Sequence, residues 1–256
     1  MPTLPSETTS SENDPDRSQS LPDGLLEGEE KTRAVRLMFD RIAPKYDFLN
    51  RIMTFGMDRP WRRKALVASG LGEGDLVVDL ACGTGDLCEM LLDKGCIPLA
   101  FDPSLGMLAQ AQSRFAARPL VFAASYGEFL PLRDASVDGF TSGFALRNFT
   151  DLGKVFQEAG RVVRPGGRMM LIDVSEPRNP LLRWGHNVYF RKIVPLVGGV
   201  LSDRAAYRYL PESTAYLPSP AEIVLLIEQA GFGEVDHFQL GGGIVQVFTA
   251  SRVAVS

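Results

Sequence analysis

This chain of 256 residues is predicted to have an α/β fold, in which helices cover both faces of a doubly wound, mostly parallel sheet of seven strands. From residue 75 onwards, short apolar runs that suit buried strands alternate with segments of helical periodicity. Such alternation is typical of a parallel sheet with both faces covered. Two adjacent runs near the end, 232–240 and 243–251, are typical of a closing hairpin, so the sheet is expected to be mostly rather than entirely parallel.

The expected elements follow one another in a simple order. Strands are expected at 75–80, 97–102, 119–123, 137–142, 168–175, 232–240 and 243–251. Helices are expected at 84–94, 104–116, 151–163 and 220–230. The Arg-Pro-Gly-Gly sequence at 164–167 predicts a tight turn from helix into strand, and Gly231 is expected to cap the last helix.

Two segments lie outside this alternation. Residues 32–70 are predicted to form a helical lid, because apolar residues recur there at helical spacing, and Pro44 is expected to end or kink the first lid helix. Residues 177–218, which are rich in proline and aromatic residues, form an insertion after the fifth strand. The lid, the sheet and the insertion are expected to make one domain, 31–256.

Residues 1–30 form a block of different composition. They carry eight acids against one base, Arg17, and almost no large apolar residues. Such a segment cannot bury enough apolar surface to offset the entropy of ordering it. A disordered acidic tail is therefore expected.

Composition excludes several classes of protein. A net charge of −4 argues against a nucleic-acid-binding surface. The three cysteines, Cys82, Cys88 and Cys96, have neither a metal-binding spacing nor the even number of a disulfide framework, and we expect buried thiols in a reducing compartment and no metal. The sequence shows no apolar run long enough to span a membrane and no signal-peptide pattern. We therefore expect a cytoplasmic protein.

A small-residue turn after the first strand is the strongest functional signal. Asp79 lies in the apolar run, and the turn at 81–85 carries Gly83 and Gly85. Glycine lets a ligand approach the backbone closely, and the helix behind the turn offers free N–H groups. The second apolar run ends in Asp102, an acid placed where open α/β folds bind ribose hydroxyls. These features predict a cofactor site.

The cofactor expected there has a nucleoside end and an amino-acid end. A dinucleotide fingerprint needs the pattern Gly-x-Gly-x-x-Gly, but the corresponding residues are Ala81, Gly83 and Asp86, and an acid at position 86 would repel a pyrophosphate. The pattern acid-x-x-x-Gly-x-Gly instead resembles motif I of the class I S-adenosylmethionine (SAM) methyltransferases. SAM is therefore the expected cofactor, and the alternative is a tight βα turn without a ligand.

Further motifs narrow the resemblance. They lie at 38–50, 55–56, 61–63, 144–151, 161–168 and 206–213. Together they resemble the ubiquinone/menaquinone biosynthesis C-methyltransferase family over roughly residues 33–247. Members of that family methylate a ring carbon of a polyprenylated quinol, with SAM as the donor.

The resemblance implies the residues of the cofactor site. Thr84 and Asp102 match the family's cofactor-contacting threonine and its ribose-binding acid. Asp79, Gly83 and Gly85 belong to the same motif and complete this part of the expected site.

Three positions depart from the family's pattern. Tyr126, followed by Gly127, stands where the family usually has an Asp or Asn near the adenine edge, and it offers only a hydroxyl or a stacking face. Both residues are included in the expected cofactor site. Gly143 replaces a usual serine, and Phe248 stands where the closing strand generally has a histidine. These departures bear on which acceptor the chain uses.

Arg147 and Asn148 are the first candidates for catalysis. Arg147 follows the strand at 137–142, at the edge where open α/β sheets bind ligands. Since a guanidinium stays protonated, we assign it the stabilisation of a phenolate or the orientation of a proton-accepting water. The resemblance associates this Arg-Asn pair with catalysis, and Asn148 would fix the water or a quinol oxygen. The alternatives are an arginine that caps the helix at Asp151 and an asparagine that only shapes the turn.

Tyr46 and Asp47 are the second pair of candidates. The resemblance places this segment of the lid at the active site, where Asp47 would be the general base. The alternatives are a core aromatic at Tyr46 and a helix N-cap at Asp47. The two histidines, His186 and His237, are expected to be structural or exposed.

The composition of the insertion bears on which acceptor the protein uses. Residues 181–200 interleave aromatic and aliphatic side chains with Arg183, Arg191 and Lys192. Such a stretch suits the interface of a membrane, where a polyprenyl substrate resides, and we expect peripheral contact at the inner face. The alternative is an ordinary helix that covers the core.

The expected reaction is SAM-dependent C-methylation of a polyprenylated quinol, either demethylmenaquinol or a related benzoquinol, in respiratory quinone biosynthesis. One alternative is a paralogue that methylates another aromatic or lipid-like small molecule. Another is a non-catalytic module that retains the fold. A nicotinamide oxidoreductase is disfavoured by Asp86, and the sequence does not indicate an oligomeric state.

Overall fold

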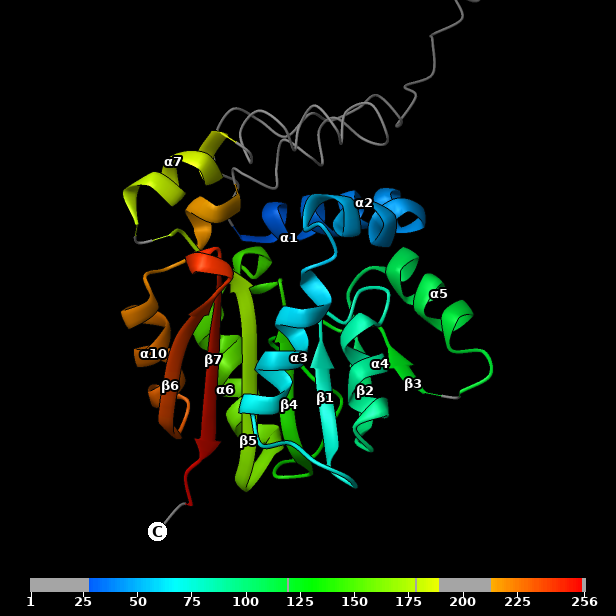
Figure 1. The fold of residues 1–256 in the computed structure, drawn as a ribbon. Coiled ribbons are helices and arrows are strands. Elements are labelled where there is room, and N and C mark those ends of the chain that lie inside the picture. The colour runs from blue at the N-terminus through cyan, green and yellow to red at the C-terminus, as the bar shows by residue number, and fades with distance from the viewer. Residues whose placement is uncertain (1–27, 119, 178, 189–212, 255–256) are drawn as a thin grey trace, which may run out of the picture.

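A computed structural model describes residues 28–118, 120–177, 179–188 and 213–254 (Figure 1). Most of the predicted acidic tail and the central part of the insertion lie outside the described residues. The first helix, α1 (Gly28–Ile42), begins inside the predicted tail. Glu29 and Glu30 occupy its first turn, where negative charge stabilises a helix, so the tail prediction was too long by three residues.

Seven strands form one sheet in the order β3-β2-β1-β4-β5-β7-β6. Their bounds are β1 Leu76–Leu80, β2 Ile97–Phe101, β3 Val121–Ala123, β4 Val137–Gly143, β5 Val163–Val174, β6 Phe232–Leu240 and β7 Val245–Arg252. The pairs that join β1 to β5 are parallel, and β7 runs antiparallel to both β5 and β6. The doubly wound, mostly parallel sheet is therefore confirmed.

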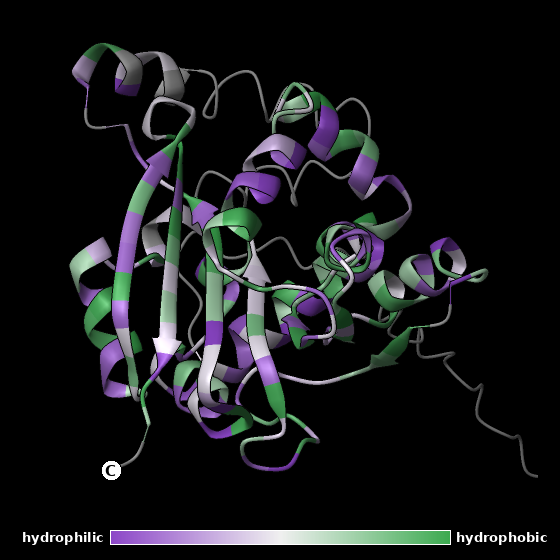
Figure 2. Cartoon of the chain, turned by 60° about the horizontal axis from the view of Figure 1, so that its bottom comes forward, coloured by the Kyte–Doolittle hydropathy of each residue, from purple (hydrophilic) through white to green (hydrophobic). Residues whose placement is uncertain are grey.

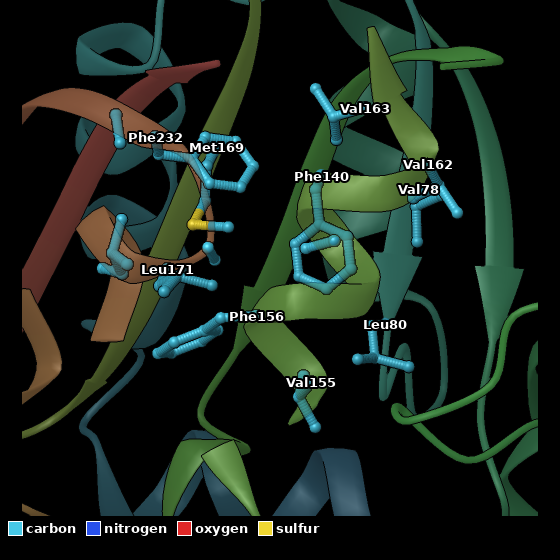
Figure 3. Close-up of a cluster of buried hydrophobic side chains, with 14 of the residues drawn as sticks. Val78, Leu80, Phe140, Val155, Phe156, Val162, Val163, Met169, Leu171 and Phe232 are labelled. Atoms are coloured by element: carbon cyan, nitrogen blue, oxygen red, sulfur yellow. The ribbon is translucent and has the colours of Figure 1, made fainter. Parts of the chain in front are cut away.

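Helices cover both faces of the sheet (Figure 1). On one face α6 (Leu152–Val162) and α10 (Pro220–Gln229) pack on β1, β4, β5 and β7, in a core that contains Phe140, Phe156 and Met169 (Figure 3). On the other face α3 (Asp58–Ala68) and α4 (Asp86–Asp93) bury Leu66 and Leu91 against the sheet. The remaining elements are η1 Ala43–Lys45, α2 Tyr46–Met53, α5 Leu105–Arg114, η2 Leu146–Asn148, α7 Pro180–Val188, η4 Ser213–Tyr216 and η5 Gly241–Gly243.

The lid is shorter than predicted. Figure 1 shows α1 and α2 across the carboxyl ends of the parallel strands. Along the chain, η1 with Pro44 joins these two helices. The third helix of the predicted lid, α3, packs on the sheet instead, because Ala65 and Leu66 are buried against Val77 and Met170. The segment that lies over the sheet edge is therefore α1 to α2.

Several local boundaries differ from the prediction, and the largest difference lies at a glycine-containing turn. Helix α4 starts at Asp86 rather than 84, because Gly85 has φ +89° and is the N-cap. β5 starts at Val163 rather than 168, and the predicted turn at 164–167 is an irregularity within it, across which the pairing to β4 shifts register. The C-cap of α10 is Ala230, and Gly231 follows it with φ +83°.

Figure 2 shows both hydrophobic and hydrophilic residues on the helices around the sheet. This pattern is expected of amphipathic helices that cover a sheet with one side. None of the helices in the described part of the chain combines the length and the hydropathy needed to cross a bilayer.

Close packing of α6 on α10 requires Gly160. A Cβ at this position would lie 2.2 Å from the carbonyl oxygen of Ala230, which is backbone and cannot rotate away. We expect Gly160→Ala to lower the free energy of unfolding by roughly 1–3 kcal/mol, measured by urea denaturation, although alanine is the better helix former. Gly153→Ala in the same helix is the matched control, since its Cβ would meet no atom closer than 3.3 Å. Equal stability of the two variants would contradict this account.

Candidate active site

Three neighbouring cavities lie at the carboxyl edge of the sheet. The Asp102 cavity lies between α1, the turn after β1, the end of β2 and the loops that follow β3 and β4. The Asp79 cavity lies beside the same turn and reaches α3 and α4. The apolar cavity, about 460 Å³, lies between α2, α3, α7 and the β6–β7 connection.

Asp102 is held in place by backbone donors. Gly83 N–H donates to its Oδ2 at 2.9 Å, and Ser104 N–H donates to its Oδ1 at 2.8 Å. Burial raises the pKa of Asp102 to about 6, and these two N–H donors act against that rise. The carboxylate is therefore mostly ionised at neutral pH and has lone pairs left to accept bonds from a vicinal diol.

The turn between β1 and α4 lies in the walls of the Asp102 and Asp79 cavities. Ala81, Gly83 and Gly85 all have positive φ, between 55° and 89°. A Cβ at Gly85 would lie 2.5 Å from the Phe115 ring, so this position has no room for a side chain. A Cβ at Gly83 would extend toward Tyr46, at 3.9 Å. Glycine is required here by conformation and by space.

Asp79 lies beneath this turn and is almost fully buried. It accepts hydrogen bonds from Cys88 Sγ at 3.1 Å and from Thr141 Oγ1 at 3.2 Å. Burial raises the pKa of Asp79 to about 7, against the effect of these two donors. Asp79 and Thr84 are both among the residues that line the Asp79 cavity.

Asp47 lies outside the walls of the three cavities. Its Oδ1 accepts a short hydrogen bond from Thr84 Oγ1, and its Oδ2 is 3.8 Å from Arg114 Nη1. It lines none of the three cavities, and Lys45 rather than Asp47 is the N-cap of α2. The N-cap alternative is therefore wrong, and the geometry gives no support to a general base at Asp47. The residue ties the lid to the turn after β1.

Tyr46 lies where the three cavities meet, since it lines all of them. Burial raises the pKa of its phenol, while the Arg62 and Arg147 guanidiniums act in the opposite direction. The phenol is therefore protonated at neutral pH and can donate a hydrogen bond to a ligand.

Arg147 and Asn148 face different cavities. Arg147 lines the apolar cavity, and Asn148 lines the Asp102 cavity. Arg147 Nη1 pairs with the fully buried Asp173 carboxylate and donates to Phe144 O at 2.9 Å, while Nε donates to Ser213 Oγ at 3.2 Å. The alternative of an arginine cap on α6 is wrong, because Asp151 itself caps that helix.

The positions that depart from the family's pattern lie in different surroundings. Tyr126 and Gly127 line the Asp102 cavity, and Gly127 has no room for a side chain, since a Cβ would lie 2.9 Å from Leu80. Gly143 lines both the Asp102 and the Asp79 cavities. Phe248 is fully buried and stacks on His237 at 4.6 Å between ring centroids. Its departure therefore concerns the core and not the cavities.

Contacts of two side chains, Asp40 and Lys31, hold α1 over the Asp102 cavity. Asp40 Oδ1 accepts from Ser104 Oγ at 2.6 Å and from Gly106 N–H at 2.9 Å. Lys31 Nζ donates to Phe149 O at 2.8 Å and lies 3.9 Å from the centre of the Tyr216 ring. Burial lowers the pKa of this lysine to about 8.

Sequence reasoning missed Arg62 and Asp173. Arg62 stands in one of the motifs of the resemblance, and its spacing of four from Asp58 on one helix was a readable signal of an ion pair. Asp173 carried no signal, since its pairing with Arg147 depends on the neighbouring strand. Among the described residues, no group of three histidine, cysteine or acidic side chains could hold a metal.

The model of the ubiE/COQ5 methyltransferase family matches residues 27–252. The chain belongs to this family. It is 39% identical to the ubiquinone/menaquinone biosynthesis C-methyltransferase UbiE of Syntrophotalea carbinolica, over 85% of this chain and 93% of that protein. It is 38% identical to the demethylmenaquinone methyltransferase of Roseiflexus castenholzii, over 88% of this chain and 95% of that protein.

Solved structures show the same fold at lower identity. A putative methyltransferase of Haloferax volcanii, in complex with the Trm112 activator, aligns with a TM-score of 0.61 and 20% identity, over 84% of this chain and 98% of that chain. A SAM-dependent methyltransferase of Thermotoga maritima, described as a possible histamine N-methyltransferase, aligns with a TM-score of 0.60 and 20% identity. The alignment covers 85% of this chain and 99% of that chain.

The protein is therefore a SAM-dependent methyltransferase of the ubiE/COQ5 family, and SAM is its cofactor. The residues that line the Asp102 and Asp79 cavities have the chemistry that this molecule needs. Asp102 and the backbone of the turn suit the ribose and the adjoining sulfonium arm, and the Asp79 cavity continues past the turn in the direction of the amino-acid end.

The raised pKa of Asp79 predicts a dependence of stability on pH. An unfolded Asp has a pKa of about 3.9, so between about pH 4 and 7 the folded state binds more protons, and the free energy of unfolding falls as pH rises. We expect the free energy of unfolding to fall between pH 5 and pH 8 by roughly 1–4 kcal/mol less in Asp79→Asn than in the wild type, measured by urea denaturation at both pH values. Asp93→Asn, at an exposed carboxylate, should keep the wild-type pH dependence. An unchanged pH dependence in Asp79→Asn would show that burial does not disfavour the Asp79 charge.

Proposed function

We propose that this enzyme C-methylates the ring of a polyprenylated quinol, demethylmenaquinol or a related benzoquinol, in respiratory quinone biosynthesis. The observation that carries the proposal is the apolar cavity, which meets the cofactor side at Tyr46 and Phe144 and has Arg147 in its wall. An acceptor there would be an apolar molecule with an oxygen for the guanidinium. The names of the relatives agree with this substrate class.

The cofactor supplies a methyl group that is already activated on a sulfonium. The ring carbon would form a bond to this methyl group as the bond from methyl to sulfur breaks, with S-adenosylhomocysteine as the leaving group. The ring carbon would then give its proton to water, which restores the aromatic ring. The protein therefore mainly aligns the two reactants and excludes water, and such alignment contributes about 7–11 kcal/mol in favourable cases.

Arg147 would make the ring carbon nucleophilic. A phenolic hydroxyl has a reference pKa of about 10, so its ionisation at neutral pH requires a nearby cation or base. Asp173, Ser213 and Phe144 O fix Nη1 and Nε of Arg147. Nη2 makes no hydrogen bond to any residue that the structure describes, and its N–H groups are the donors that we assign to the quinol oxygen.

Tyr46 and Asn148 would complete the alignment. Tyr46, between the cofactor and the acceptor cavities, is placed to orient the ring with its hydroxyl and its apolar face. Asn148 lies on the cofactor side of η2 and is placed to hold a water or the second quinol oxygen. The backbone of η2 fixes the spacing of Asn148 and Arg147.

The proposal is tested by binding and turnover in one preparation. We expect SAM binding by calorimetry, and methyl transfer to demethylmenaquinol under reducing conditions. Arg147→Ala should lower kcat/KM by about 100-fold or more, because it removes the oxyanion donor, while SAM affinity stays within about threefold. Arg118→Ala, at an exposed arginine that pairs with Asp93, is the control and should retain activity.

The outcomes separate the alternatives. SAM binding without turnover on a panel of quinols would point to another aromatic or lipid-like acceptor, the alternative that Tyr126 and Gly143 favour by departing from the family's pattern at the cofactor cavity. Absence of SAM binding would leave a non-catalytic module.

We also propose peripheral contact with the inner face of the membrane through the segment 181–200, of which residues 181–188 are described. Leu181 and Trp184 on α7 are 75% and 68% exposed, and Phe55 at the end of the lid is 79% exposed. Leu181 and Phe55 also line the apolar cavity. Apolar side chains at its mouth would insert at the headgroup boundary, where a polyprenyl substrate enters from the bilayer.

Vesicle binding tests this contact. We expect Phe55→Ser and Trp184→Ser each to weaken binding to vesicles of phosphatidylethanolamine and phosphatidylglycerol by about 10-fold, because each removes about 1.5 kcal/mol of apolar burial. Phe129→Ser is the matched control, since Phe129 is 80% exposed but lines none of the cavities. Equal weakening by Phe129→Ser, or no weakening by the other two, would overturn the contact.

A further inference from the structure

Arg62 is a buried cation that the proposed reaction does not use. Its side chain is only 7% exposed, on the face of α3 that meets the sheet edge. It lines both the Asp79 cavity and the apolar cavity. A guanidinium in this position needs negative charge or acceptors around it, because burial of an uncompensated charge is costly.

The described residues accept hydrogen bonds from only some of the N–H donors of this guanidinium. Nη1 donates to Asp58 Oδ2 at 2.7 Å, and the Phe144 ring lies 4.7 Å from the guanidinium carbon. Asp86 is 3.9 Å away and pairs more closely with Arg114, at 2.7 Å. Nε and Nη2 make no hydrogen bond to a residue in the described part of the chain, so up to three N–H donors remain for a ligand.

The Asp79 cavity is the continuation of the cofactor site. Asp102 and Tyr126 lie in the Asp102 cavity, which therefore suits the adenosine end. Tyr46, Gly83 and Gly143 line both this cavity and the Asp79 cavity. A cofactor with its ribose on Asp102 would cross the turn at Gly83 and extend its amino-acid end toward Asp79.

The Asp79 cavity offers that end both an acceptor and a cation, while Asp86, the second acid in its wall, pairs with Arg114 at 2.7 Å. The amino-acid end of SAM carries an ammonium and a carboxylate, and Asp79 supplies an acceptor for the ammonium. Arg62 is the only cationic side chain among the described residues that line this cavity. A Cβ at Gly143 would lie 3.8 Å from Arg62 Nε, so glycine keeps this side of the guanidinium accessible.

We propose that Arg62 binds the α-carboxylate of the cofactor through Nε and Nη2, while Asp58 and the Phe144 ring hold the guanidinium in place. The inference rests on the SAM cofactor and deepens the proposed function at its donor site, independently of the acceptor. A bidentate pair of this kind fixes direction as well as charge, which a lysine cannot reproduce. Arg62 would thereby set how far the cofactor reaches along the turn, and so where its methyl group lies.

Two ligands that differ only in the amino-acid end test this role. S-adenosylhomocysteine carries the carboxylate, and 5′-methylthioadenosine lacks the whole amino-acid end but keeps the nucleoside. We expect Arg62→Met to weaken S-adenosylhomocysteine binding about 10- to 100-fold by calorimetry, the usual loss for a charge-assisted hydrogen bond, and to leave 5′-methylthioadenosine binding within about threefold. Arg62→Lys should give an intermediate loss for S-adenosylhomocysteine alone.

Arg59→Met is the matched control. Arg59 lies on the same helix, pairs with Glu89 at 2.7 Å and does not line the Asp79 cavity, so its loss should affect neither ligand by more than about twofold. Equal weakening of both ligands by Arg62→Met would show a structural role and overturn the proposal, as would no weakening of either. Failure of the wild-type protein to bind either ligand would instead overturn the cofactor assignment.

Discussion

The hydrogen bond from Gly83 N–H to Asp102 fixes the geometry on which the rest of the site depends. It joins the turn after β1 to the end of β2, two chain segments that the sheet already places side by side. Without it the turn could take other conformations, and the acid could point to solvent. Through it, the buried Asp102 carboxylate holds one side of the turn, and Asp79, which accepts from Cys88 Sγ beneath the same turn, lies on the other side.

Local patterns in the sequence predicted the parts of the molecule that local forces determine. Strand β1, the turn at 81–85 and Asp102 follow from an apolar run, from glycines and from an acid at a strand end, so their mutual placement needed no knowledge of distant segments. The fold class, the closing hairpin and the kink at Pro44 are of the same kind. Thr84 came from the resemblance to a family, and Arg147 came from its position after the strand at 137–142 together with that resemblance. The structure brings both to the sheet edge.

What the sequence could not predict depends on partners that are distant along the chain. For Asp47 the sequence left a general base and a helix N-cap open, and it did not show that Thr84 and Arg114 engage the carboxylate. The role of Asp173 appears only when β5 lies beside the loop after β4. Arg62 was visible as one charge among many in a helix, and only the packing of α3 on the sheet turns it toward the cavities. Tertiary contacts decide these positions, and no single-segment pattern contains them.

The position of β7 has a consequence for how the protein is made. β7 follows β6 along the chain, yet it lies between β5 and β6 instead of at the edge. Until β7 has left the ribosome, β5 exposes an open edge and β6 has no partner, so the growing chain carries a surface that pairs readily with other strands. Val245, which lines the apolar cavity, arrives with the same strand. The sheet and this wall of the apolar cavity are thus completed together, once β7 has paired, and a chain interrupted before β7 is exposed to aggregation.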